Sequence, residues 1–162
     1  MFLEKDVIIV GGGPIGIACA LECKKIGWNY LVLEKGTLTN SLFNYPKNMT
    51  FFSTSEKLEI NNIPFISNNP KPNRDEALEY YRRVATSNTL QINLYETVKA
   101  INKADTLFKI ETNRNNYLAK KALMQETIYP PSLFDFEEPE FKSKISDINA
   151  SLSDFLESNK AI

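Results

Sequence analysis

The chain has 162 residues, of which 43% are hydrophobic and 24% charged, and its formal net charge is -1. This length fits one domain of ordinary size, and the scattered basic residues exclude the basic stripe that marks a nucleic-acid-binding protein. No apolar stretch approaches the roughly 18 residues of a membrane span, and the N-terminus carries Glu4 and Asp6 in place of a signal peptide, so we expect a cytoplasmic protein with no membrane partner.

The sequence contains no histidine. Histidine is the commonest general base and the commonest metal ligand, so we predict no metal site and assign no catalytic side chain. Any chemistry would come from a bound cofactor.

The first predicted elements are a strand, a glycine turn and a helix. Residues 6–10 are a short apolar, β-branched run of the kind that forms a buried parallel strand. The run continues directly into Gly11, Gly12, Gly13, Pro14, Ile15 and Gly16, which match the pattern G-x-G-x-x-G. A helix is predicted from this turn to about Ile26, with Gly27 as its stop, and residues 30–34 form the second strand.

This order of elements predicts an α/β, Rossmann-like dinucleotide-binding fold. Gly11 permits the tight turn, Gly13 lets the backbone approach a pyrophosphate, and Gly16 lets the helix pack closely on the strand. Glu34 ends the second strand 18 residues after Gly16, where a carboxylate accepts bonds from ribose hydroxyls and repels a 2'-phosphate. The turn therefore favours FAD or NAD over NADP as the ligand, against the plainer interpretation of a glycine-rich turn that binds nothing.

All six glycines lie in the first 36 residues. At an average usage of about 7%, roughly nine would be expected in the 126 residues that follow. A second glycine turn for a second dinucleotide therefore has no place in this sequence.

Cys19 and Cys23 lie four residues apart on the predicted first helix. A redox pair typically has the C-x-x-C spacing, so we interpret these two cysteines as small buried apolar residues.

Beyond Glu34 the sequence predicts a long loop, a helix and a β-meander. The loop covers residues 35–50, and the two aromatic residues after it, Phe51 and Phe52, are interpreted as core anchors more readily than as ligand contacts. Asn73 and Glu76 form a capping box for a helix that runs to about Ser87. Apolar runs then predict strands at residues 91–95, 98–102, 107–112 and 117–124.

The end of the chain differs in charge from the rest. Residues 1–124 hold 16 basic and 12 acidic side chains, whereas residues 125–162 hold 3 and 8. We assign residues 1–124 to the dinucleotide-binding domain and leave residues 125–162 as an unassigned acidic tail. Apolar residues at helical spacing predict an amphipathic helix at about 139–158, which either covers sheet surface or serves protein binding or self-association.

Several segments, taken together, carry a family resemblance. They are Asp6 to Gly16, Glu34 to Gly36, Asn44 to Pro46, Met49 to Thr54, Ile63 to Phe65 and Ala77 to Val84. These segments look like the N-terminal half of the FAD domain of the bacillithiol-disulfide reductase family, which belongs to the thioredoxin reductase-like flavoproteins. The M-T-F-F-S-T and Y-Y-R-R runs are the most specific part of this resemblance.

The resemblance implies a flavoprotein that binds FAD in this domain, takes hydride from NADPH bound in a second domain and reduces a low-molecular-weight disulfide. It implies that Gly11, Gly13, Pro14 and Ile15 line the pyrophosphate. Further along the chain it assigns Glu34 to the ribose, Lys35 to the adenosine edge, Met49 and Thr50 to the flavin side, and Val98 to the adenine.

The chain also departs from the family pattern. Ile15 stands where family members commonly carry cysteine, and the sequence after Tyr117 lacks the family's Ala-Thr-Gly turn, its NADPH domain and its returning flavin segment. We therefore expect a truncated FAD domain that turns over weakly or not at all by itself. Two alternatives stay open: a non-catalytic module that acts through a partner, and a flavin monooxygenase, which has the same opening fingerprint.

Overall fold

The computed structural model describes residues 2–124, so the predicted helix at 139–158 lies outside the described residues. In chain order the elements are β1 (Phe2–Val10), α1 (Pro14–Lys25), β2 (Tyr30–Glu34), α2 (Asn40–Phe43), the short 3-10 helix η1 (Glu56–Leu58), α3 (Arg74–Ser87), β3 (Ile92–Leu94), β4 (Val98–Ala104), β5 (Leu107–Thr112) and β6 (Asn116–Met124).

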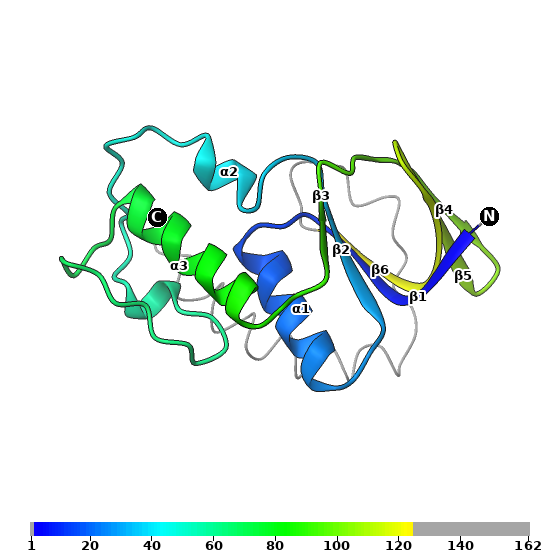
Figure 1. Cartoon of the computed structure of the whole chain (residues 1–162), viewed down its shortest axis with the longest axis horizontal. Coiled ribbons are helices and arrows are strands. Elements are labelled where there is room, and N and C mark those ends of the chain that lie inside the picture. Colours follow the sequence, from blue (N-terminus) through cyan, green and yellow to red (C-terminus); the bar gives the residue numbers. More distant parts are fainter. Residues whose placement is uncertain (1, 125–162) are drawn as a thin grey trace.

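The described elements form layers around a six-stranded sheet with the strand order β3-β2-β1-β6-β5-β4. Figure 1 shows α3 beside α1, α1 beside the strands β1 and β2, and the hairpin of β4 and β5 on the far side. One apolar core, with Val7, Cys19 and Val32, lies between α1 and the sheet. A second core, with Ile8 and Tyr117, is made by side chains of β1, β2, β5 and β6.

The strand pairing confirms the predicted fold class. Strands β3, β2, β1 and β6 pair in parallel, and β4, β5 and β6 form an antiparallel meander. The fold is therefore α/β and Rossmann-like, with a parallel core extended by a meander. Strand β3 is shorter than the predicted run at 91–95, because the chain leaves the strand at Tyr95 with a φ of 56°.

Strand β1 is longer than the sequence predicts. The apolar run begins at residue 6, whereas the strand begins at Phe2, and its first residues pair with β6 from Asn116 onward. Phe2 and Leu3 stay 43% and 44% exposed. The partner strand extends β1 here, and a local apolar pattern could not reveal it.

Helix α1 begins and ends where the sequence predicts. Pro14 occupies the first turn, where its missing N–H costs nothing, and Gly27 follows the helix with a φ of 75°. Cys19 and Cys23 are buried against the sheet and unpaired, which confirms their interpretation as apolar residues.

The loop predicted at residues 35–50 contains a short helix, α2, that the sequence did not indicate, and η1 follows beyond this loop. Phe51 packs against the core around Tyr80 and Tyr81, as predicted. The prediction is wrong for Phe52, which is 74% exposed. The chain bends at Phe52, and only the ring of Phe51 reaches the core.

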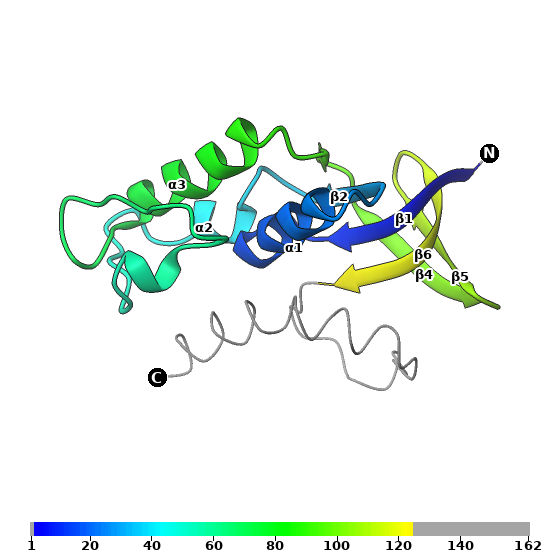
Figure 2. The same cartoon turned by 90° about the horizontal axis from the view of Figure 1, so that it is seen from below.

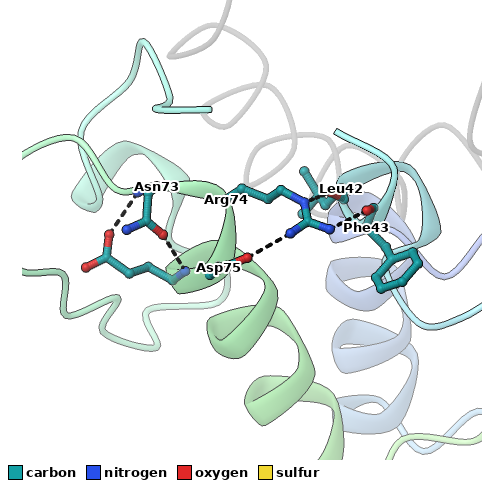
Figure 3. A network of polar contacts seen from close by, with 6 residues as sticks. Leu42, Phe43, Asn73, Arg74 and Asp75 are labelled. Carbon is teal, nitrogen blue, oxygen red and sulfur yellow. Dashed lines mark hydrogen bonds and ion pairs between the residues drawn. The ribbon is translucent and has the colours of Figure 1, made fainter. Parts of the chain in front are cut away.

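Helix α3 has the predicted capping box. Asn73 Oδ1 accepts the backbone N–H of Glu76 at 2.9 Å, and Glu76 Oε2 accepts the backbone N–H of Asn73 at 2.8 Å, as Figure 3 shows. The helix runs to Ser87, and on its buried face Tyr80 stacks on Phe65 with ring centroids 4.3 Å apart.

Candidate cofactor-binding site

The sheet topology points to one edge of the molecule. Strands β1, β2, β3 and β6 are parallel, so their carboxyl ends meet at the same edge, seen in Figure 2 at the tips of the β1 and β6 arrows. The chain adds β2 and β3 on one side of β1 and then returns to place β6 on the other side. Open α/β sheets bind ligands where the strand order reverses in this way.

The glycine turn lies at this edge. Gly11 has a φ of 108°, and its N–H donates to the carbonyl oxygen of Leu33 at 2.9 Å, which fixes the turn against the end of β2. A Cβ on Gly16 would lie 1.9 Å from the carbonyl oxygen of Gly11. Because no side chain fits there, the helix can approach the strand only with glycine at position 16.

The turn leaves backbone donors open at the start of α1. Pro14 has no N–H, and the first helical bond runs from the N–H of Ile17 to Gly13 at 2.9 Å. Within residues 2–124 the N–H groups of Gly13, Ile15 and Gly16 have no hydrogen-bond acceptor. Open donors at the positive end of a helix dipole form a site for an anion such as a pyrophosphate.

Glu34 is held beside this turn. The residue is only 6% exposed, and its Oε2 accepts the N–H of Gly12 at 2.7 Å while its Oε1 accepts the N–H of Gly36 at 2.8 Å. A Cβ on Gly12 would lie 3.0 Å from the Glu34 Cβ, so glycine permits this close approach. A carboxylate has about four lone-pair positions, and Glu34 therefore keeps acceptor capacity for ligand hydroxyls.

Lys35 and Val98 are each linked to the end of β2, in different ways. Lys35 follows Glu34 directly and is exposed. Val98 packs against the core that contains Leu33, and the N–H of Glu96 donates to the carbonyl oxygen of Glu34 at 2.9 Å. Lys35 thus directly follows the strand end beside the glycine turn. Val98 lies in register with Thr112 of β5 and is linked to β2 through the core around Leu33 and through Glu96.

Met49 and Thr50 are held elsewhere, at the start of α3. The N–H of Arg74 donates to the carbonyl oxygen of Met49 at 3.0 Å, and Thr50 forms an isolated bridge with Asn73. In the described part of the chain neither residue is hydrogen-bonded to the glycine turn. The link to the turn is made by Thr39, whose N–H donates to the carbonyl oxygen of Gly12 at 2.9 Å.

Sequence reasoning missed Glu96, which is 1% exposed. Its carboxylate accepts hydrogen bonds from Thr112 at 2.7 Å, Tyr117 at 2.9 Å and Asn93 at 2.9 Å. Burial raises the pKa of Glu96, but these hydrogen bonds outweigh the burial and leave the pKa below its ordinary value. These partners lie on three separate segments of the chain, so no local sequence pattern could predict the role of Glu96.

Two further properties concern residues 2–124 alone. Within that range no group of three or more cysteine, aspartate or glutamate side chains has the geometry to hold a metal ion. None of the helices there has the length and apolarity to cross a membrane.

Comparison with known proteins identifies the family. The family described as "Pyridine nucleotide-disulphide oxidoreductase" matches residues 8–146. Bacilliredoxin reductase Bdr of Bacillus subtilis (strain 168) is 41% identical over 128 residues, which cover 78% of this chain and 40% of that protein. A thioredoxin reductase of Ureaplasma parvum is 26% identical over 97% of this chain and 46% of its own length.

Solved structures agree with this assignment. Bacillithiol disulfide reductase Bdr from Staphylococcus aureus superposes with a TM-score of 0.73 and 40% identity, covering 76% of this chain and 38% of that protein. A flavin-containing monooxygenase from Stenotrophomonas maltophilia has a TM-score of 0.70 at 20% identity, over 80% of this chain and 42% of its own, and shows the fold alone. The chain thus spans about two fifths of the length of these reductases. From residue 8 to residue 146, this chain belongs to the pyridine nucleotide-disulphide oxidoreductase family.

Proposed function

We propose that this chain is the N-terminal part of the FAD-binding domain of an NAD(P)H-dependent disulfide reductase of the bacillithiol-disulfide reductase type. The observation that carries the proposal is the set of open N–H groups at the start of α1 beside the fixed carboxylate of Glu34. A dinucleotide carries groups that match both features. In a Rossmann-like fold its anionic pyrophosphate lies at the start of the first helix, and its ribose hydroxyls bind the carboxylate at the end of the second strand.

The residues present fit FAD, and each part of it has a proposed contact. Gly11, Gly13, Pro14 and Ile15 line the pyrophosphate, with Gly12 and Gly16 shaping the turn. Glu34 accepts from the ribose hydroxyls, and Lys35 and Val98 border the adenosine. Met49 and Thr50, held at the start of α3, face the flavin side.

When bound, FAD would supply the redox chemistry, passing electrons from a reduced nicotinamide to a disulfide. The residues of this chain bind and orient the dinucleotide. We assign the NADPH site to the part of the protein that corresponds to the remaining length of the relatives, because the described residues hold a single glycine turn. We also propose residues 1–124 as the structural unit and a cytoplasmic location.

The reductase function is better supported than a monooxygenase function. The monooxygenase likeness is 20% in identity, whereas the reductase likeness reaches 40% and 41% over more than three quarters of the chain. Fold alone does not distinguish the two chemistries.

The test is a titration of the purified 162-residue chain with FAD, in which the visible absorption band of the flavin reports binding. Dithionite or NADPH is then added to the complex under anaerobic conditions. We expect a bound flavin band that dithionite bleaches and that NADPH alone leaves oxidised. Bleaching by NADPH would contradict the assignment of the NADPH site to another part of the protein. The absence of flavin binding would contradict the proposed cofactor role of this chain.

A further inference from the structure

Figure 3 shows Arg74 between α2 and the start of α3. The residue is buried, with only 8% of it exposed. Its Nε donates to the carbonyl oxygen of Leu42 at 3.1 Å, and its Nη2 donates to the carbonyl oxygen of Phe43. Its Nη1 pairs with Asp75 at 2.8 Å. The guanidinium thus uses its fork of donors to join the end of one helix to the start of another.

The two carbonyls that Arg74 binds are at the C-terminal end of α2. The last carbonyls of a helix lack partners within the helix, and a cation at that end is favourable. Helix α2 has four residues and buries only Leu42, and a helix of this length has little stability of its own. Arg74 therefore supplies α2 with hydrogen bonds and a favourable charge that the short helix cannot supply itself.

The other end of α2 is tied to the glycine turn through Thr39. This residue is fully buried with a φ of 55°, an uncommon conformation for a β-branched residue that the surroundings must enforce. Its N–H donates to the carbonyl oxygen of Gly12, and its carbonyl accepts the N–H of Phe43 at 3.0 Å. A shift of α2 would therefore move Gly12.

Gly12 in turn holds the carboxylate of Glu34 through its N–H at 2.7 Å. Arg74 also fixes Met49 through its own backbone N–H. Arg74 thus contacts both ends of the segment from Leu42 to Met49 directly, and it reaches the glycine turn only through α2 and Thr39.

We propose that Arg74 is a positioning residue for the dinucleotide site. It fixes α2 so that Thr39 holds Gly12, and through Gly12 it orients the Glu34 carboxylate, without contacting the dinucleotide. The FAD readout of this inference rests on the proposed function, while the coupling from Arg74 to Thr39 is testable without FAD.

The experiment compares the full 162-residue wild type with Arg74→Met, Arg74→Lys and the control Arg82→Met. Arg82 lies over the same Phe43 ring as Arg74, with its Cζ 5.9 Å from the centroid against 5.6 Å, but within residues 2–124 it donates no hydrogen bond to α2. The control therefore removes a cation from the ring and leaves the carbonyl contacts intact.

Two quantities are measured for each variant: the dissociation constant for FAD, and the amide hydrogen exchange of Thr39 in the absence of FAD. For Arg74→Met we expect FAD affinity to fall about fivefold or more and exchange at Thr39 to accelerate. Arg74→Lys keeps the charge and some of the donors. Its FAD affinity and its exchange rate at Thr39 should therefore lie between those of Arg74→Met and the wild type. Arg82→Met should match the wild type in both.

The possible results separate the two claims. Unchanged Thr39 exchange in Arg74→Met overturns the coupling, and faster exchange with unchanged FAD affinity overturns the positioning role. A wild type that binds no FAD overturns the proposed function and with it the positioning role, whereas the exchange data still decide the coupling. If Arg74→Met does not fold, Arg74→Lys replaces it in the comparison. FAD affinity and Thr39 exchange in Arg74→Lys equal to those of Arg82→Met would then overturn the inference.

Discussion

At the scale of single residues, the site depends on positions where a side chain would not fit and on one carboxylate held by backbone donors. Gly11, Gly16 and Glu34 were readable from the sequence because the motif itself specifies their spacing. Thr39, Arg74 and Glu96 were not, because their roles come from contacts with residues far away in the sequence. A buried arginine or glutamate is recognisable only once its partners are placed.

Gly16→Ala should destabilise the protein far more than Gly27→Ala. The Cβ at position 16 would lie 1.9 Å from a backbone oxygen, whereas at Gly27 it meets nothing within 4 Å and only the φ of 75° is unfavourable. We expect a loss of about 3 kcal/mol for Gly16→Ala and about 1 kcal/mol for Gly27→Ala. Urea unfolding measures both, and equal losses would mean that the tight approach at Gly16 is not required.

Glu96→Gln should lower stability at neutral pH by about 2 kcal/mol, because the buried carboxylate accepts several hydrogen bonds. The folded-state pKa of Glu96 is below its ordinary value. Its contribution is therefore complete above the ordinary glutamate pKa of about 4.3 and is lost as the pH falls through the folded pKa.

The measurement for Glu96 is the free energy of unfolding of both proteins as a function of pH. The gap between wild type and Glu96→Gln should narrow on acidification. Glu111→Gln, at an exposed position on β5, serves as the matched control and should show no such gap. If the difference in unfolding free energy between wild type and Glu96→Gln stays constant at acidic pH, the ionised carboxylate is not its source.

At the scale of elements, local signals predicted β2 and α3 at their observed bounds. Strand β2 is a continuous apolar run, and α3 starts at a capping box. Helix α2 and the first residues of β1 lack such signals. The first is held by Arg74 and Thr39, and the second by pairing with β6.

Asn73→Ala should cost about 1 kcal/mol of stability by removing the cap of α3. Asn73→Asp keeps an acceptor for the N–H of Glu76 and should stay close to the wild type. Thermal unfolding of the three proteins compares them directly. An alanine variant as stable as the aspartate variant would show that the cap contributes nothing.

The thiols of α1 should be inert in the folded protein. Burial raises the pKa of Cys19 to about 11 and that of Cys23 to about 12. At about pH 8 the reactive thiolate is then a very small fraction of either residue. Iodoacetamide should label neither cysteine until urea unfolds the chain, and rapid labelling under native conditions would contradict their burial against the sheet.

At the scale of the whole molecule, the return of β6 beside β1 creates the edge on which the proposed site lies. The sequence predicted a parallel core and a meander, but not which side of β1 the last strand would take, because that choice depends on contacts between distant segments. Family membership, shown over residues 8–146, is consistent with the dinucleotide fingerprint at the start of the chain.

We propose that this edge of the sheet binds FAD through the open donors of α1 and the carboxylate of Glu34. The most direct test of this proposal is the dissociation constant of FAD for the wild type, Glu34→Gln and the control Glu111→Gln. We predict binding by the wild type and the control, and affinity weakened about tenfold or more in Glu34→Gln, since a hydrogen bond to a charged group is worth about 1.5–3 kcal/mol. A wild type that does not bind FAD, or a Glu34→Gln variant that binds it equally well, would contradict this mode of FAD binding.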